Sequence, residues 1–320
     1  MPAFTASAPG KIILFGEHAV VYGQPAIAVP ISQVQARAVV RADPGQRPGR
    51  VRIQAPDIHL ETDLADLPGE HPLAVAFRTL FSALDISRPP ALSVRVTSTI
   101  PIAAGLGSGA AVSVALFRAL SAFLGHSLED EQICALAFEV EKLHHGTPSG
   151  IDNTVITYAR PVFFERDREG NGRENKVELL RVPRPFTILI ADTGIPSPTA
   201  IAVSDVRRAR ETEPERYETI FASIGEIARE ARAMIEAGEL DALGSLMDRN
   251  HALLREIGVS SPALDRLVRV ARSAGALGAK LSGGGRGGNM ISLIDPQAAQ
   301  HVNKALQEAG ATRTILTTIG

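Results

Sequence analysis

The chain has one cysteine and no tryptophan among its 320 residues. The single cysteine, Cys134, excludes an internal disulfide and a thiolate cluster for zinc or iron–sulfur, so we interpret it as a small apolar core residue of a cytoplasmic protein. Neither sign of charge dominates, because the chain has 33 Lys and Arg and 35 Asp and Glu, a formal net charge of −2. Without a basic block to neutralise phosphates, no nucleic acid partner is expected.

Only one stretch is long and apolar enough to suggest a membrane helix. Residues 96–117 carry no charged side chain, and about 20 such residues can cross a bilayer. The stretch contains Pro101 and three glycines, however, so we predict a strand, a loop and the start of a buried helix instead. No signal peptide is recognised in residues 1–10, and no membrane partner is expected.

Hydrophobic periodicity predicts strands and helices in the first half of the chain. The predicted strands cover residues 3–15, 26–30, 33–41, 51–54, 92–98, 154–158 and 161–164. The predicted helices cover residues 73–84 and 109–124 and a third segment that ends near residue 144. Ser127 with Asp130 is interpreted as the capping box that opens this third helix. Residues 166–176 are predicted to form a hairpin tip or a loop between domains.

The second half mixes helices and strands without a regular alternation. A strand is predicted at residues 186–191, and apolar residues recur at helical spacing in 220–235 and 243–254. Ser261 and Pro262 open a further helix, followed by strands near Lys280 and at 290–294 and 312–318 and a helix at 298–309. These patterns predict an α+β fold in two lobes, 1–180 and 181–320.

The segment PIAAGLGSGAAVSVALF, residues 101–117, has the pattern of an anion-binding loop. A strand leads into Gly105, Gly107 and Gly109, and a helix follows directly, so backbone N–H groups would face outward at the helix N-terminus. The segment has neither the Gly-Lys-Ser/Thr of a Walker loop nor the acidic residue of a Rossmann unit. Taken alone, a tight structural turn is an equal alternative.

Two other segments carry polar groups where a buried strand ends. In APGKIILFGEHAVVYG, Lys11 is followed by Glu17 and His18 just past an apolar strand; a surface turn is the alternative interpretation. In KLSGGGRGG, residues 280–288, five glycines and an arginine lie between two apolar strands. This second segment predicts another close approach of backbone to a ligand rather than a flexible linker.

Glu141 and Asp152 in EKLHHGTPSGID form a candidate acid–base pair. Glu141 lies at the border of the apolar stripe of its predicted helix, and Gly146, Pro148 and Gly150 turn the chain before Asp152. Two carboxylates beside a phosphate loop suit Mg²⁺-dependent phosphoryl transfer, in which one ligates the cation and the other accepts a hydroxyl proton. A solvated helix acid and a strand or turn cap are the alternatives.

The strings APGKIILFGEHAVVYG, PIAAGLGSGAA, EKLHHGTPSGIDN and AKLSGGGRGG resemble, in this order, the motifs of the GHMP small-molecule kinases. Within that family, GEHAVVYG and HGTPSGIDN are most similar to the mevalonate kinases. The resemblance implies a two-lobed α+β fold with an active-site cleft between the lobes. It also implies ATP as phosphoryl donor, Mg²⁺ as cofactor, the 5-hydroxyl of mevalonate as acceptor and a homodimer.

The resemblance assigns roles to matching positions. Asp152 matches the general base, Lys11 the lysine near the transferred phosphate, and Glu141 the carboxylate that ligates magnesium, with Ser108 as a second magnesium ligand. The substrate-binding positions that match are Glu17, His18, Ser149 and Thr199. The ATP-binding positions that match are Pro101, Ala104, Gly105, Leu106, Gly107, Ser108, Gly109 and Ala110.

The chain departs from the family pattern at three positions. Gly109 replaces the second of two serines, so Ser108 or water must serve the magnesium. Ser197 stands where mevalonate kinases often have an arginine, so another cation binds the substrate carboxylate or the substrate differs. Arg286 interrupts the third glycine motif, either as a turn residue or as a phosphate contact.

Two classes of alternative function stay open, and Ser197 is the feature that keeps the first of them open. One is a GHMP kinase for homoserine or phosphomevalonate, or a decarboxylase of the same pathway. The other is a non-catalytic sensor that binds ATP and a metabolite. The presence of Lys11, Glu141 and Asp152 together argues against the sensor, because a protein that only binds does not need a proton acceptor.

Overall fold

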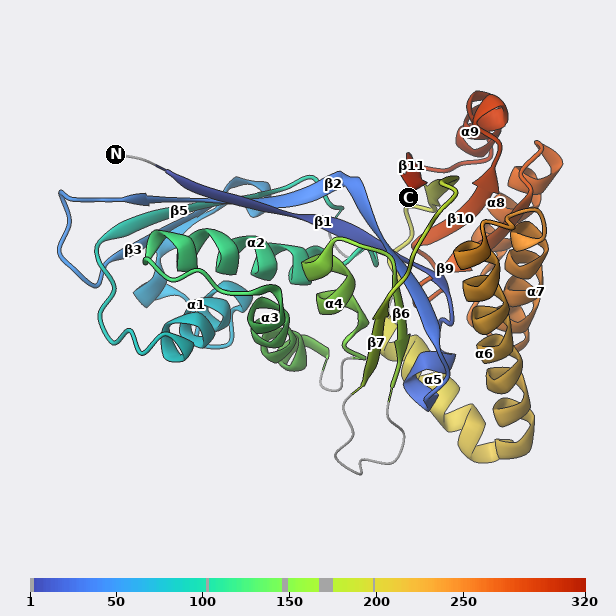
Figure 1. Cartoon of the computed structure of the whole chain (residues 1–320), viewed down its shortest axis with the longest axis horizontal. Helices are drawn as coiled ribbons and strands as arrows, with labels where there is room; N and C mark the ends of the chain where they lie inside the picture. Colours follow the sequence, from blue (N-terminus) through green and yellow to red (C-terminus); the bar gives the residue numbers. More distant parts are fainter. Residues whose placement is uncertain (1–2, 102–103, 146–148, 167–174, 198) are drawn as a thin grey trace. The chain divides into compact units, whose positions relative to one another are not determined.

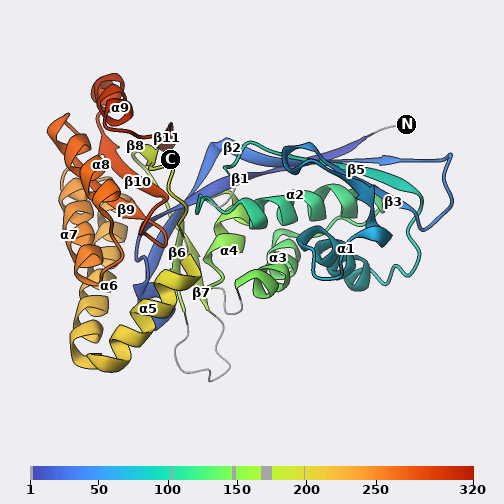
Figure 2. The ribbon, with the colours of Figure 1, turned by 180° about the vertical axis from the view of Figure 1, so that it is seen from behind.

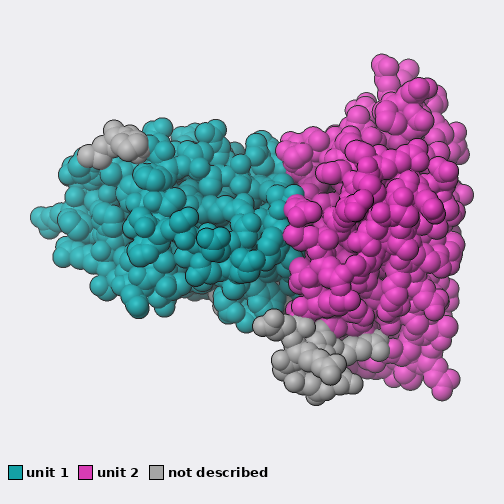
Figure 3. Space-filling view, in the orientation of Figure 1, with its two compact units in different colours: residues 1–10, 34–101, 107–159 teal, residues 11–33, 102–106, 160–320 magenta. Residues whose placement is uncertain are grey.

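The computed structural model describes residues 3–101, 104–145, 149–166, 175–197 and 199–320. The chain divides into two compact units that are discontinuous in sequence (Figure 3). Unit 1 comprises residues 1–10, 34–101 and 107–159, and unit 2 comprises residues 11–33, 102–106 and 160–320. The predicted division of the family domains at residue 180 stays a prediction.

Unit 1 contains a sheet of mixed direction. Strand β5 (Leu92–Ser98) pairs in parallel with β3 (Val51–Ala55) and antiparallel with the second part of β2 (Ala26–Ala42). β4 (Leu60–Asp63) pairs antiparallel with β3, and β1 (Phe4–Phe15) pairs with β2. Alternate residues of β5 and β3 are buried, as expected for a sheet that is covered on one face.

Four helices cover that face of the sheet of unit 1 (Figures 1 and 2). They are α1 (Pro72–Ala83), α2 (Ser108–Phe123), α3 (Asp130–His145) and α4 (Ile151–Tyr158). α2 contacts α1, α3, α4 and β5, and its residues 113–117 are all buried. A helix that is apolar on nearly all sides is typical of a protein core. Burial of α2 therefore explains why the second part of the stretch 96–117 has no charged residue.

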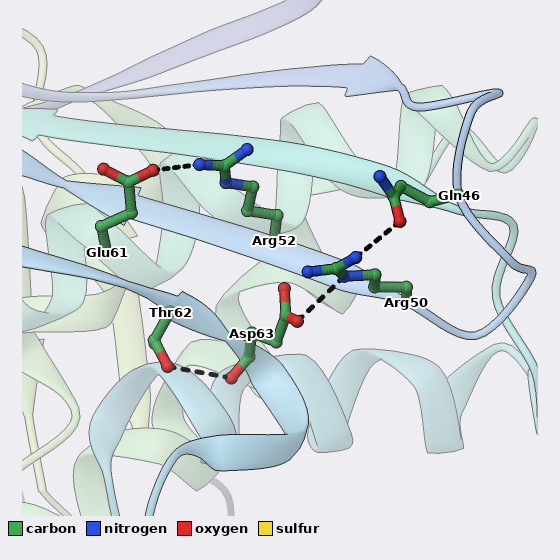
Figure 4. A network of polar contacts seen from close by, with 6 residues as sticks. All are labelled: Gln46, Arg50, Arg52, Glu61, Thr62 and Asp63. Carbon is green, nitrogen blue, oxygen red and sulfur yellow. Dashed lines mark hydrogen bonds and ion pairs between the residues drawn. The ribbon is translucent and has the colours of Figure 1, made fainter.

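The exposed side of the β3–β4 hairpin carries charged pairs (Figure 4). Arg50 Nε donates to Asp63 Oδ2 at 2.9 Å, and Arg52 pairs with Glu61. Arg50, Arg52 and Glu61 are exposed and Asp63 is partly exposed, so solvent screens both pairs and each contributes little to stability. The pairs therefore lie on the surface of the hairpin and are not a main source of the stability of the fold.

Unit 2 is built on a four-stranded antiparallel sheet in the order β11-β8-β10-β9. Its strands are β8 (Phe186–Asp192), β9 (Gly278–Ser282), β10 (Asn289–Ile294) and β11 (Arg313–Ile319). The helices of this unit are α5 (Thr199–Thr212), α6 (Pro214–Ala237), α7 (Leu243–Glu256), α8 (Pro262–Ser273) and α9 (Ala299–Glu308).

The core of unit 2 lies between this sheet and its helices. α7 and α8 contact β9, α8 also contacts β10, and α9 contacts β8 and β11. Buried side chains from these strands and helices form one hydrophobic cluster, which includes Phe221, Leu254 and Met290. A short hairpin of β6 (Val162–Glu165) and β7 (Lys176–Leu179) pairs with the first part of β2.

The predicted α+β class is confirmed, and three local predictions are wrong. Residues 154–158, predicted as a strand, form the second part of α4. The third helix begins at Asp130, so Ser127 is too far from its first turn to cap it. Residues 26–42 form one strand through Pro30 rather than two. Among the described residues, no helix is long and apolar enough to cross a membrane.

Candidate active site

The N-terminus of α2 is built to receive an anion. Gly107 occupies the N-cap position with φ 74°, a left-handed conformation that glycine adopts at little cost. No side chain of the described residues caps this helix end. The N–H groups of Ser108, Gly109 and Ala110 are in the first turn and have no partner within the helix, and the helix dipole adds positive potential there.

Residues 104–106, which precede this helix in the chain, belong to unit 2 and form hydrogen bonds within that unit. Lys11 N donates to Leu106 O at 3.0 Å, and Asn289 Nδ2 donates to Ala104 O. Gly105 between them is exposed and has φ 75°. The Lys11 side chain is buried, with 5% exposure. Pro101, at the end of unit 1's preceding segment, is half-buried.

Glu141 on α3 lies beside the start of α2 in unit 1. Its side chain is buried, and a Cβ added at Gly109 would lie 3.3 Å from Glu141 Oε1. No group of three His, Cys, Asp or Glu residues that could hold a metal occurs among the described residues. Mg²⁺ in nucleotide sites takes one or two carboxylates and completes its shell with phosphate and water oxygens. A single carboxylate beside an anion-binding helix end fits that requirement.

Replacing Gly109 by serine tests this site. The new hydroxyl would lie next to Glu141 and offer a further oxygen ligand, so we expect the Mg²⁺ concentration for half-maximal activity to fall by about two- to tenfold. Gly109→Ala adds the Cβ without the oxygen and is the matched control. Equal Mg²⁺ dependence of Gly109→Ser and Gly109→Ala would place the magnesium elsewhere.

Asp152 lies in the first turn of α4, where the helix dipole stabilises a carboxylate. The turn before the helix depends on Gly150, which has φ 88°, and on Ser149, whose Oγ accepts from Ile151 N at 3.3 Å. Asn153 Nδ2 donates to Cys134 O at 3.1 Å and so fastens α4 to α3. The half-buried Asp152 is thereby held on a short, anchored helix.

Cys134, at this anchor point, behaves as a structural residue. Burial raises the pKa of its thiol, and Asn153 Nδ2 contacts Sγ at 3.2 Å. A protonated, partly buried thiol is a poor nucleophile. Cys134 is therefore structural and unreactive, but it is partly buried at the α3–α4 contact rather than fully buried in the core.

Glu17 forms a fully buried ion pair with Lys280 on β9. Its other oxygen, Oε2, accepts from Asn250 Nδ2 at 3.2 Å, and Lys280 Nζ also donates to Leu281 O at 2.7 Å. Burial lowers the pKa of Lys280, and the adjacent Glu17 opposes that effect. These contacts exclude the surface-turn alternative, whereas contact of Glu17 with a substrate stays a prediction.

His18 is buried and neutral near pH 7. Its Nε2 lies 3.0 Å from Gly284 O, and because a carbonyl only accepts, Nε2 carries the proton. Burial lowers the pKa of His18 to about 4; the bond to Gly284 opposes this, and Arg286 adds to it. His251 on α7 is similar, since its Nδ1 accepts from Leu281 N at 3.3 Å and burial lowers its pKa to about 4.

These two histidines predict acid sensitivity. An unfolded chain has a histidine pKa of about 6.5, so between pH 6.5 and 4 the unfolded state binds more protons, and the free energy of unfolding falls as the pH falls. From pH 7 to 5 each histidine should remove about 2 kcal/mol. Urea unfolding over this range measures the loss. His251→Gln keeps a hydrogen-bonding side chain that does not titrate, so it should remove about half of the slope; an unchanged slope would contradict this assignment.

The predicted site residues fall into both units. Asp152, Glu141, Ser149, Pro101 and the loop residues 107–110 lie in unit 1, and Lys11, Glu17, His18, Thr199 and the loop residues 104–106 lie in unit 2. Thr199 is exposed at the start of α5 and packs on Gly284, where a Cβ would lie 2.6 Å from Thr199 Oγ1. The roles of these residues and the predicted cleft stay predictions.

Several residues that support the site were given no functional or supporting role in the sequence analysis. They are Asn153, which anchors α4, and Lys280 and Asn250, which hold Glu17. For Lys280 a signal existed, because a lysine inside the short apolar strand at 278–282 requires a buried partner. Nothing in the local sequence distinguishes Asn250.

Comparison with known proteins gives matches along nearly the whole chain. The family model for the N-terminal domain of GHMP kinases matches residues 72–160, and that for the C-terminal domain matches residues 231–312. A mevalonate kinase from Thermococcus gammatolerans is 38% identical, covering 97% of this chain and 94% of that protein. The chain belongs to the GHMP kinase family. A mevalonate kinase from Pyrococcus horikoshii is 37% identical, with 95% and 92% covered.

Solved structures of this family share the fold. A crystal structure of L. major mevalonate kinase in complex with R-mevalonate superposes with a TM-score of 0.84 at 30% identity, covering 100% of this chain and 96% of that one. The predicted family and fold class are thereby confirmed. As a GHMP kinase, the chain is an ATP-dependent kinase of small molecules.

Proposed function

We propose that this GHMP kinase transfers the γ-phosphoryl group of ATP to the 5-hydroxyl of mevalonate. The observation that carries the proposal is similarity at 36–38% identity, over 95–97% of the chain, to relatives named mevalonate kinase. The local geometry supports it, because the start of α2 offers N–H groups to phosphates and Glu141 lies beside them.

In the proposed reaction the chain's own residues orient charge and move one proton. The first-turn N–H groups of α2 bind the phosphate oxygens, and Glu141 holds Mg²⁺, which neutralises phosphate charge when bound. Asp152 accepts the proton of the attacking hydroxyl, and the Lys11 ammonium stabilises the negative charge that develops on the transferred group. Binding of Mg²⁺ by Ser108 belongs to the same proposal.

A panel of acceptors tests the proposal. ADP release is measured by a coupled assay with mevalonate, phosphomevalonate or homoserine as acceptor, each with ATP and Mg²⁺. We expect kcat/KM for mevalonate to exceed the others by at least about 100-fold, because buried polar groups left without partners disfavour the wrong substrate. Preference for another alcohol would identify a different kinase of the family, and ATP binding without turnover on any acceptor would identify a sensor.

Two further expectations accompany the proposed function. We propose that the protein acts as a homodimer, as the resemblance implies, and that it works in the cytoplasm. Light scattering of the purified chain measures the first, and fractionation of the producing cells measures the second.

A further inference from the structure

The turn between β9 and β10, residues 283–288, collects polar side chains from distant parts of unit 2. His18 Nε2 donates to Gly284 O, and Ser197 Oγ donates to Gly285 O at 2.8 Å. Thr199 packs directly on Gly284. Two residues predicted to bind the substrate, His18 and Thr199, therefore meet at this turn.

Arg286 is the one residue of the turn that carries a side chain, and its backbone is strained. Its φ is 61°, a region that residues other than glycine rarely occupy. A Cβ at Gly284, Gly285 or Gly287 would collide with neighbouring atoms, so residues 284–287 can carry a side chain only at position 286. Glycine would adopt this conformation at position 286 without strain. The presence of an arginine there instead indicates that its side chain has a function.

The charge around Arg286 is net positive. Asp205 on α5 accepts from Arg286 through Oδ2 and from Arg208 through Oδ1. These hydrogen bonds, from Arg286 first and Arg208 second, hold the pKa of Asp205 below its usual range. Two arginines share one carboxylate, so the group retains one positive charge. Asp205 is bonded to Nη1 of Arg286, and the planar guanidinium presents a second edge, formed by Nε and Nη2, that matches a carboxylate.

The neighbours of this turn in unit 2 are chiefly residues predicted to bind the substrate or residues next to them. His18 and Thr199 both contact Gly284, two positions before Arg286, and the N–H of Arg286 donates to Val259 O at 2.7 Å. A Cβ at Gly288 would lie 3.1 Å from Ser197 Cβ and 3.7 Å from Ala104 O, so the phosphate loop is the more distant of these two neighbours. The neutral His18 adds no charge of its own.

We propose that Arg286 binds the carboxylate of the acceptor substrate and so determines specificity. This rests on the proposed function. Ser197 Oγ donates to Gly285 O, the neighbour of Arg286, so the segment before α5 reaches the same turn. Arg286 is therefore the charged side chain of the turn at which His18, Ser197 and Thr199 meet.

Arg286→Gly tests the proposal without threatening the fold, because glycine prefers the φ that position 286 requires. We expect the KM for mevalonate to rise about 10- to 100-fold, as for loss of a charged hydrogen bond, while kcat and the KM for ATP change less than about twofold. The variant should also lose the preference of the wild type for mevalonate over its uncharged primary amide. Arg249→Gln, on the exposed face of α7, removes one positive charge elsewhere in unit 2 and should change none of these values.

A second variant adds a rescue. Ser197→Arg combined with Arg286→Gly places an arginine on the other side of the Ser197–Gly285 contact and should recover most of the lost affinity for mevalonate. An unchanged KM for mevalonate in Arg286→Gly would overturn the proposal, and so would a rise confined to the KM for ATP, which indicates a phosphate contact. Failure of the wild type to phosphorylate mevalonate would overturn the proposed function itself, and that result is visible without any variant.

Discussion

Asp152→Asn should lower kcat about 10²- to 10⁴-fold and leave the affinity for ATP nearly unchanged. Asparagine has almost the same shape, so the turn at Gly150 and the anchor at Asn153 persist. The amide cannot accept the proton of the attacking hydroxyl, so the loss falls on the chemical step. Single-turnover phosphorylation of mevalonate measures that step, and displacement of a fluorescent nucleotide measures ATP affinity.

The control for Asp152→Asn is Asp66→Asn. Asp66 is an exposed acid of unit 1, so its replacement makes the same charge change away from the site. We expect its kcat to match the wild type within about twofold. Turnover of Asp152→Asn at the wild-type rate would remove Asp152 from the mechanism, and a parallel loss of ATP affinity would mean that the substitution disturbs the loop rather than the chemistry.

Lys280→Met should destabilise the protein by about 3–5 kcal/mol, the largest stability effect we expect from one substitution. Glu17 and Lys280 are both fully buried. Among the described residues, the substitution leaves the Glu17 carboxylate with only the neutral Asn250 amide as a side-chain partner. An unpaired buried carboxylate costs far more than the pair itself contributes. Urea unfolding followed by circular dichroism gives the free energy.

A double variant distinguishes the cost of losing the Glu17–Lys280 ion pair from the cost of leaving the Glu17 carboxylate buried without a cation. Glu17→Gln with Lys280→Met removes both charges and keeps an oxygen that accepts from Asn250, so it should recover more than half of the loss. Lys304→Met on the exposed face of α9 is the control and should cost less than about 0.5 kcal/mol. If the double variant is no more stable than Lys280→Met, the stranded charge is not the cause.

The elements that the sequence predicts best are those whose propensity and burial agree. Strand β5 alternates buried and exposed residues and matches the predicted range of 92–98, and Ser261 caps α8 as predicted, with its Oγ accepting from Leu264 N at 3.4 Å. The prediction for residues 154–158 of α4 is wrong because these residues are rich in β-branched and aromatic side chains, which favour strands. The left-handed Gly150 and the Asn153 anchor override that preference, and both act through tertiary context.

For the site, sequence motifs identify the groups but not their partners. The glycine pattern correctly predicts the open end of α2, because the need for positive φ is local. The partners of Glu17 and Arg286 are Lys280 and Asp205, which lie 263 and 81 positions away in the chain. Such pairs arise only when distant segments pack together, so neither spacing nor composition predicts them. The proximity of Gly109 to Glu141 likewise depends on how α2 packs against α3.

The central claim is that this chain phosphorylates the 5-hydroxyl of mevalonate, and ³¹P NMR tests it most directly. The wild-type protein is incubated with ATP, Mg²⁺ and mevalonate, and the spectrum is followed over time. The account predicts a new phosphomonoester resonance, split by the two protons on carbon 5, that grows in equal amount with ADP. ADP formation that does not depend on mevalonate, or the absence of that resonance while ATP is intact, would contradict it.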